Sequence, residues 1–290
     1  MSVVWACCSS GRSSSIAAKT LSALHDVGFI GNLLVCVPHA ELPTYTKALE
    51  DYPVQVIGAE KGLVKQRKHI RSMFAEGQEI VFIDDDVTRI RIMYGRAIHP
   101  ITNIHATIDT LFQCLHNMEG PLMWGCYPMI NRDWMKERMS IGNCYVVGAF
   151  YGIINDPRLV EPVIDECEDW ARSLSEQKAG RAPVRFDWLG IDTRYFKNSG
   201  GMQQDRSPEK RRAAVEALVA QYSDIVKLKN RKGGHLDLKA LKKPVYLEIG
   251  PLARPPATVT AAPAVSASPH TPEAPPVAPS PPLRPSCSVQ

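Results

Sequence analysis

The chain has 290 residues, a formal net charge of +4 at pH 7 and 44% hydrophobic residues. This length is sufficient for one large domain or two small ones, and the hydrophobic share is ordinary for a soluble globular protein. The longest nearly apolar run, CYVVGAFYGII, is too short to span a bilayer. None of the eight cysteines forms a Cys-x-x-Cys pair, which excludes a zinc ribbon and a thioredoxin-like site.

Residues 1–247 alternate between apolar runs and segments with helical spacing. The segments between the runs, residues 14–28, 40–52 and 63–77, predict helices. The runs themselves predict four strands: VVWACC (3–8), NLLVCVP (32–38), VQVIGAE (54–60) and EIVFID (79–84). Strand and helix in alternation predict an α/β fold with a Rossmann-like, mostly parallel sheet that helices cover.

The composition changes near Gly250. Twelve of the 23 prolines lie between this glycine and the last residue, in a segment with almost no large apolar side chains. Such a segment buries too little apolar surface to offset the entropy lost on ordering. We therefore expect one domain over residues 1–247 and a disordered Pro/Ala-rich tail over residues 248–290.

Polar residues follow three of the predicted strands, where ligands bind in open α/β sheets. These are SSGR (9–12), GAEKG (58–62) and the three aspartates at 84–86. Adjacent carboxylates repel each other unless a cation lies between them, and Mg²⁺ or Mn²⁺ prefers oxygen ligands. On an extended backbone Asp84 and Asp86 point the same way and Asp85 points the opposite way. The triplet predicts a metal and nucleotide site, and the alternative is a solvated acidic turn or a helix N-cap.

Two other nucleotide-binding classes fit less well. A Walker B aspartate requires a Gly-x-x-x-x-Gly-Lys-Ser/Thr loop, which is missing from the chain. A nucleotidylyltransferase usually has a Gly- and Arg-rich loop after its first strand, and SSGRSSS is a weak match to that loop.

The order SSGR followed by GAEKGLVKQRKHIRSMFAEGQEIVFIDDD resembles the nucleotide-sugar half of GT-A-fold glycosyltransferases. A later segment, ECEDWARSLSEQKAGRAPVRFDWLGIDT, resembles the one in which a Glu-Asp pair opens a helix. The NSGGMQ loop (198–203) is most like the TET-associated, base J-type DNA glycosyltransferases of phages. The resemblance covers about residues 3–240, and it departs at Lys68, where many relatives have Asn.

The resemblance implies an inverting, metal-dependent transfer of a sugar, from a nucleotide-sugar such as a UDP-sugar, to the hydroxyl of 5-hydroxymethylpyrimidine in double-stranded DNA. Asp169 is then the base, with Glu168 beside it. A Mn²⁺ or Mg²⁺ ion is held by Asp86, Asp84 and, by position only, His235. The implied nucleotide-sugar contacts are Ser9, Ser10, Arg12, Gly62, Arg67, Asp84 and Asp85, with Lys61 as a further cation.

Further residues are candidates for the acceptor side. Trp124 and Trp134 are candidates for lining an acceptor cleft, although a tryptophan is more often core or rim packing. Gly200 and Gly201 permit close approach of the backbone to sugar or phosphate, or form only a turn. Asp187 and Asp192 are reserve candidates for the base. Basic residues gather in three sets: 61–71, 210–212 and KLKNRKGGHLDLKALKK (227–243).

A basic set is consistent with phosphate contacts, although a charge run is usually a solvated face. Two alternative functions therefore stay open. One is a glycosyltransferase with a glycan or protein acceptor, and the other is a non-catalytic nucleic-acid-binding protein with the same fold. We expect a cytoplasmic protein with no membrane contact, in the host cytoplasm if a phage encodes it. The N-terminus has no signal-peptide pattern, and several cysteines lie in apolar runs, as in a reducing compartment.

Overall fold

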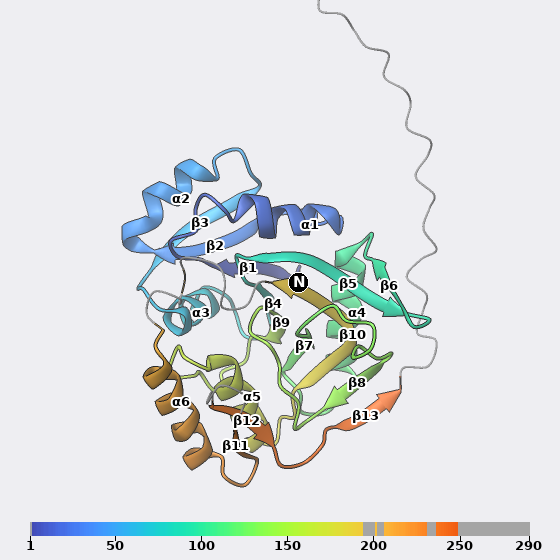
Figure 1. Ribbon diagram of the computed structural model, residues 1–290. Coiled ribbons are helices and arrows are strands. Elements are labelled where there is room, and N and C mark those ends of the chain that lie inside the picture. The colour runs from blue at the N-terminus through green and yellow to red at the C-terminus, as the bar shows by residue number, and fades with distance from the viewer. Residues whose placement is uncertain (1, 194–200, 202–205, 231–235, 249–290) are drawn as a thin grey trace, which may run out of the picture. The chain divides into compact units, whose positions relative to one another are not determined.

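The computed structural model describes residues 2–193, 201, 206–230 and 236–248 (Figure 1). The four predicted strands are present as β1 (Val4–Cys8), β2 (Leu33–Pro38), β3 (Val54–Ala59) and β4 (Glu79–Ile83). They pair in parallel, with β1 between β2 and β4 and with β3 beyond β2. The tail expected over residues 248–290 lies outside the described residues except for Glu248, so both the tail and the boundary at 247 stay predictions.

Three helical segments connect these strands, and each is shorter than its predicted range. The first is a π-helix, η1 (Ala17–Leu21), which continues as α1 (Ser22–Asp26). The second is a 3₁₀ turn, η2 (His39–Glu41), followed by α2 (Leu42–Ala48). The third is α3 (Leu63–Ser72), which begins directly after Gly62. Gly62 has φ +129°, and a Cβ there would lie 3.1 Å from an Asp165 carboxylate oxygen. A glycine therefore suits the start of α3.

The second half of the chain widens the sheet with antiparallel pairs. Its strands are β5 (Val87–Tyr94), β6 (Ala97–Pro100), β7 (Met123–Tyr127), β8 (Arg138–Ile141), β9 (Phe150–Ile154), β10 (Val184–Thr193) and β13 (Val245–Glu248). The strand order is β13-β8-β10-β7-β9-β4-β1-β2-β3, and the β5–β6 hairpin pairs with β10. Of these later strands only β7 and β10 pair in parallel with each other. The expected α/β sheet is thus present, and it is parallel around β1 and mixed beyond β4.

The sheet is buried on both faces at β1, β2 and β4, because these strands are apolar, and their alternate residues enter two separate cores. Trp5 and Cys7 of β1 pack on the side of α1, α2 and α4 (Ile104–His116). Ala6 and Cys8 pack on the opposite side, with Ile70 of α3. Strands β2 and β4 divide their residues between the two cores in the same way. This double burial is typical of parallel strands covered by helices.

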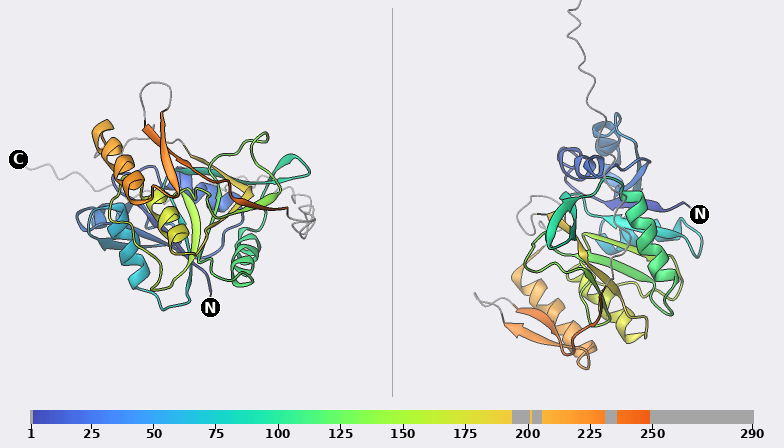
Figure 2. Two further views of the ribbon diagram at one scale, coloured as in Figure 1. Left: turned by 90° about the horizontal axis from the view of Figure 1, so that it is seen from below. Right: turned by 90° about the vertical axis from the view of Figure 1, so that its right-hand side faces the viewer.

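A third apolar cluster lies next to the sheet. It joins α5 (Glu168–Lys178) to α6 (Pro208–Gln221) and to the two-stranded hairpin of β11 (Val226–Asn230) and β12 (Leu236–Ala240). The hairpin stands out beside α6 in the left-hand view of Figure 2. No helix among the described residues is long and apolar enough to cross a membrane.

Gly152 of β9 tests the core packing. It lies opposite Trp124 of β7, and a Cβ there would fall 2.3 Å from the Trp124 indole. We expect Gly152→Ala to lower the free energy of unfolding by about 1–3 kcal/mol, because the buried indole must shift. Gly58→Ala in β3 is the matched control, because its Cβ would meet only the exposed His39 side chain. Urea denaturation measures both changes, and equal stability losses would contradict the prediction.

Candidate active site

The three aspartates form the turn between β4 and β5, at the edge of the sheet predicted for the ligand. The backbone N–H of Asp84 donates to the Ala149 carbonyl at 2.9 Å, and the Thr20 hydroxyl donates to the Asp84 carbonyl at 2.7 Å. The turn breaks the side-chain alternation of an extended strand. Asp84 therefore faces Arg67, whereas Asp85 and Asp86 both face Arg12. This corrects the expectation that Asp84 and Asp86 share one side.

Arg12 neutralises the second half of the triplet. Its guanidinium forms an ion pair with Asp85 and a second one with Asp86 at 3.1 Å. The Ser9 hydroxyl also donates to Asp85, and the Thr193 hydroxyl donates to Asp86 at 2.6 Å. Asp85 is 3% exposed. Asp85 therefore holds Arg12 and Ser9 in place, and its buried carboxylate is not free for the nucleotide-sugar contact that the resemblance implied.

The other residues predicted for the nucleotide-sugar also lie at this edge. The Ser10 hydroxyl donates to a Glu41 carboxylate oxygen at 2.7 Å. The backbone N–H of Gly201 donates to the Ser10 carbonyl at 2.8 Å. Gly201 has φ +58°, and a Cβ there would lie 3.2 Å from the Arg12 guanidinium. The structure thus brings Gly201 next to Arg12, while Gly200 and His235 lie outside the described residues.

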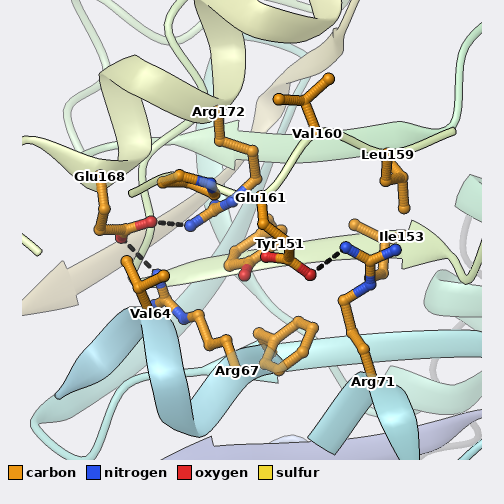
Figure 3. Close-up of a pocket in the computed structure, with 12 residues that line it drawn as sticks. Val64, Arg67, Arg71, Tyr151, Ile153, Leu159, Val160, Glu161, Glu168 and Arg172 are labelled. Atoms are coloured by element: carbon orange, nitrogen blue, oxygen red, sulfur yellow. Dashed lines mark hydrogen bonds and ion pairs between the residues drawn. The ribbon is translucent and has the colours of Figure 1, made fainter. Parts of the chain in front are cut away.

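Arg67 of α3 connects the aspartate turn to the Glu-Asp pair at the start of α5. Its guanidinium donates to Asp84 at 3.2 Å, to the Gly148 carbonyl at 2.8 Å and to the Glu168 carboxylate. Arg172, one turn further along α5, holds the other oxygen of Glu168. Figure 3 shows Arg67 and Arg172 converging on Glu168 from α3 and α5. The two acidic motifs therefore meet across one guanidinium.

The surroundings of Arg67 are closed to solvent. Arg67 is 5% exposed and Glu168 is 5% exposed. The guanidinium carbons of Arg67 and Arg172 lie 5.2 and 4.1 Å from the Tyr151 ring centroid, within cation–π range. A Cβ on Gly148 would lie 2.5 Å from a Glu168 oxygen, so a glycine fits closely there. Glu168 is therefore held by two arginines, and it is not available as a base.

Asp84 is the most exposed carboxylate of the turn, with 34% of its side chain accessible. Burial raises its pKa to about 7, Arg67 opposes this rise, and Asp86 and Asp85 add to it by repulsion. A divalent cation would relieve this repulsion, and carboxylate oxygens are the donors that Mg²⁺ and Mn²⁺ prefer. Asp84 presents such oxygens as it stands, whereas Asp86 would have to turn from Arg12 to bind the same ion. Within the described part of the chain, no three His, Cys, Asp or Glu side chains form a ready metal cluster. Phosphate and water oxygens would have to complete the coordination.

Asp169 lies beside this network and remains half-buried. One of its oxygens accepts from the Tyr145 hydroxyl, and the other accepts from the Trp170 backbone N–H at 2.9 Å. Residues 145–149 connect Asp169 to the aspartate turn. Tyr145 contacts Asp169, the Gly148 carbonyl accepts from Arg67, and the Ala149 carbonyl accepts from the Asp84 backbone N–H. Of the predicted Glu-Asp pair, Asp169 is therefore the more exposed member and forms no ion pair with Arg67 or Arg172 among the described contacts.

The remaining predicted residues have other surroundings. Trp124 is completely buried, with its ring edge-to-face against Phe112 and Phe150, so it packs the core and does not line an acceptor cleft. Trp134 is 57% exposed, and its backbone N–H donates to Asn131. The reserve candidates are engaged in ion pairs, Asp187 with Arg138 and Arg185, and Asp192 with Arg89.

The structure adds three residues that the sequence analysis did not single out. Tyr145, Arg172 and Thr193 contact Asp169, Glu168 and Asp86, respectively. Only Arg172 carried a signal, because it lies four residues after Glu168 on a predicted helix, and this spacing brings opposite charges together. Tyr145 lies between β8 and β9, and Thr193 ends β10. Both are brought to the site by the tertiary structure, so no spacing in the local sequence predicts their contacts.

No protein-family model matches this sequence, and no curated protein matches it. Among solved structures, the chain is similar to S. aureus TarS residues 1–349 in complex with UDP-GlcNAc, at a TM-score of 0.50 and 13% identity. That similarity covers 76% of this chain and 66% of the TarS chain. A second structure of TarS 1–349 gives a TM-score of 0.46 at 14% identity, covering 66% of this chain and 60% of that one.

GalNAc-T7 with UDP, GalNAc and Mn²⁺ gives a TM-score of 0.45 at 13% identity, over 77% of this chain and 49% of that chain. TM-scores below 0.5 do not by themselves indicate a common fold, so the fold rests on the first similarity. The chain spans just under two thirds of that TarS chain. Together with the strand order, this similarity confirms the expected α/β fold of the GT-A type.

Proposed function

We propose that this protein is a metal-dependent glycosyltransferase that moves a sugar from a nucleotide-sugar to a hydroxyl group. One observation carries the proposal: the Arg67 guanidinium contacts both Asp84 and Glu168. It holds the acidic turn at the sheet edge beside the Glu-Asp pair at the start of α5. A site for a charged donor thereby lies next to a carboxylate that can accept a proton.

The donor in this proposal is a UDP-sugar. The similarity to a TarS structure that contains UDP-GlcNAc supports it. Lys61, exposed at the end of β3, supplies a cation for the diphosphate. Asp84 and Asp86, with His235 as a predicted third ligand, hold Mn²⁺ or Mg²⁺. When bound, such an ion supplies Lewis-acid stabilisation of the charge on the departing diphosphate.

Asp169 is the general base in this proposal. Its carboxylate accepts the proton of the acceptor hydroxyl while the oxygen of that hydroxyl forms a bond to the anomeric carbon of the sugar. The bond between that carbon and the diphosphate oxygen breaks, and the nucleotide diphosphate carries the electron pair away. This direct displacement inverts the anomeric configuration. A positioned carboxylate within hydrogen-bond reach suits the role.

The acceptor proposed is 5-hydroxymethylpyrimidine in double-stranded DNA, and the β11–β12 hairpin supports a polyanionic partner. Lys227 and Lys239 are exposed and lie directly opposite each other in this hairpin. Like charges in that position destabilise a hairpin, and an anion between them would remove the cost. Asp237 lies opposite Lys229, but its side chain is buried and pairs with Arg211. Its negative charge therefore offsets that of Arg211 more than that of the exposed lysines.

A defined assay separates this proposal from the two alternatives. The protein is incubated with a panel of UDP-sugars, Mn²⁺ and either hydroxymethylated or plain duplex DNA, and the nucleosides are then analysed by mass spectrometry. Added sugar mass on the modified base supports the proposal. Donor hydrolysis without transfer to DNA favours a glycan or protein acceptor. DNA binding without donor turnover, unchanged in Asp86→Ala, favours a non-catalytic protein.

Asp169→Asn tests the proposed base. We expect UDP release from the active donor to fall about 10²–10⁴-fold, because the amide does not accept the proton. The affinity for UDP measured by calorimetry should stay within about twofold of wild type. Asp224→Asn is the control, since Asp224 pairs with Lys178 at the far end of the same helix. Wild-type turnover in Asp169→Asn would remove Asp169 from the mechanism.

Lys227→Glu combined with Lys239→Glu tests the acceptor partner. Anisotropy titrations with a plain DNA duplex at several salt concentrations give the dependence of affinity on ionic strength. We expect weaker binding and a slope reduced by about 2, because each lysine lost removes about one phosphate contact. Lys47→Glu with Lys136→Glu, two exposed lysines outside the hairpin, makes the same change in net charge. Equal losses in both pairs would argue against binding through the hairpin.

A further inference from the structure

Tyr145 lies in a segment, residues 145–149, that contacts both parts of the candidate site, as Arg67 of α3 also does. Its hydroxyl donates to a carboxylate oxygen of Asp169. Three and four residues later, the Gly148 carbonyl accepts from Arg67 at 2.8 Å and the Ala149 carbonyl accepts from the Asp84 backbone N–H at 2.9 Å. Four residues of chain span at most about 14 Å. This segment therefore sets how far Asp169 lies from the aspartate turn.

The Asp169 carboxylate is held from two directions. The Tyr145 phenol donates to Oδ2, and the Trp170 backbone N–H donates to Oδ1 at 2.9 Å. Each carboxylate oxygen has two lone pairs, so both oxygens keep the capacity to accept a further proton. A carboxylate with two fixed donors has one preferred rotamer, and its remaining lone pairs then point in a fixed direction.

The phenol ring is itself fixed. Tyr145 stacks on Trp170 with ring centroids 4.7 Å apart and an interplanar angle of 26°. The backbone on both sides of the contact is also joined, because the Val146 N–H donates to the Ser173 hydroxyl at 3.2 Å and that hydroxyl donates to the Asp169 carbonyl at 2.8 Å. These contacts hold the Tyr145 hydroxyl without using the Asp169 carboxylate, as a positioning group requires.

We propose that Tyr145 is a positioning residue that orients the Asp169 carboxylate for proton transfer. This inference rests on the function proposed above and names a residue that neither the sequence pattern nor the comparisons indicate. Tyr145 acts through Asp169 and does not itself exchange the proton. Small misplacements of a reacting group lower rates severely, so the hydroxyl has a measurable effect on turnover without touching the donor.

A purely structural role for Tyr145 makes a different prediction. In that case the hydroxyl would only fasten the start of α5 to the 145–149 segment. Its loss would then displace Glu168 from Arg67 and disturb the donor side as well. However, α5 has other attachments, since Glu168 is bound by Arg67 of α3 and Arg172 of α5 lies over the Tyr151 ring of β9. The donor side should therefore remain intact when only the Tyr145 hydroxyl is removed.

Tyr145→Phe removes the hydroxyl and keeps the ring that stacks on Trp170. The readout is UDP release from whichever of UDP-glucose, UDP-galactose and UDP-GlcNAc the wild type hydrolyses with Mn²⁺, with water as the acceptor. We expect kcat to fall about tenfold, with the donor KM and the calorimetric affinity for UDP within twofold of wild type. Tyr222→Phe is the matched control, because Tyr222 bonds Ser175 on the same helix at 2.8 Å. This control should retain the wild-type kcat.

Combining Tyr145→Phe with Asp169→Asn distinguishes a positioning role of Tyr145 from a general disturbance of the structure around the site. In the Asp169→Asn background, adding Tyr145→Phe should change the residual rate by less than twofold, because two groups that act as a unit are not additive. Any one of four results would overturn the inference. Tyr145→Phe could keep the wild-type kcat, or Tyr222→Phe could lose as much activity. The donor KM could rise together with the loss of kcat, or Tyr145→Phe could cause a further tenfold loss in the Asp169→Asn background. A wild-type protein that turns over none of the donors would overturn the proposed function itself.

Discussion

The structure depends on the burial of one guanidinium, that of Arg67. Moving a charge of this kind out of water costs several kcal/mol unless ion pairs and hydrogen bonds surround it, and removing one partner from a buried pair typically costs about 3–5 kcal/mol. Here the partners are Asp84, Glu168 and the Gly148 carbonyl, which come from three segments far apart in the sequence. The aspartate turn, the start of α5 and the segment before β9 are therefore all in contact with this one side chain. The backbone bond from Asp84 to Ala149 and the bond from Tyr145 to Asp169 join the same segments.

Much of this arrangement could be predicted from the sequence, because the first half of the chain is governed by local rules. Strands β1 to β4 are continuous apolar runs, which parallel strands buried on both faces require. Their order in the chain places residues 9–12, 58–62 and 84–86 at one edge of the sheet. The placing of Arg12, Gly62 and the aspartates at this edge follows from that rule, whereas Arg67 was expected only from the resemblance. The side-chain directions within the triplet do not, since they depend on a turn that replaces the extended backbone after Ile83.

The rest of the site could not be predicted because it is built by contacts between distant segments. Trp124 shows the difficulty, since an aromatic residue in an apolar run can pack in a core or line a cleft, although core packing is the more common. The pairing of β7 with β9 places Gly152 opposite Trp124 and leaves room for the indole inside the protein. Tyr145, between β8 and β9, contacts Asp169, and Thr193, at the end of β10, contacts Asp86. Both contacts join segments that lie far apart in the sequence. The Glu-Asp pair was found by resemblance, but the separate surroundings of its two members come from the tertiary structure.

The close packing around Gly148 has a consequence for how this protein can vary. The carbonyl of this residue serves the buried arginine, while its missing side chain leaves the space that the Glu168 carboxylate occupies. A single methyl group there would push apart the two acidic motifs without adding or removing any charge. The site is therefore sensitive to volume at a position that has no chemical group of its own. Gly148 is buried and carries no ionisable or nucleophilic group, yet the spacing of the two acidic motifs depends on it.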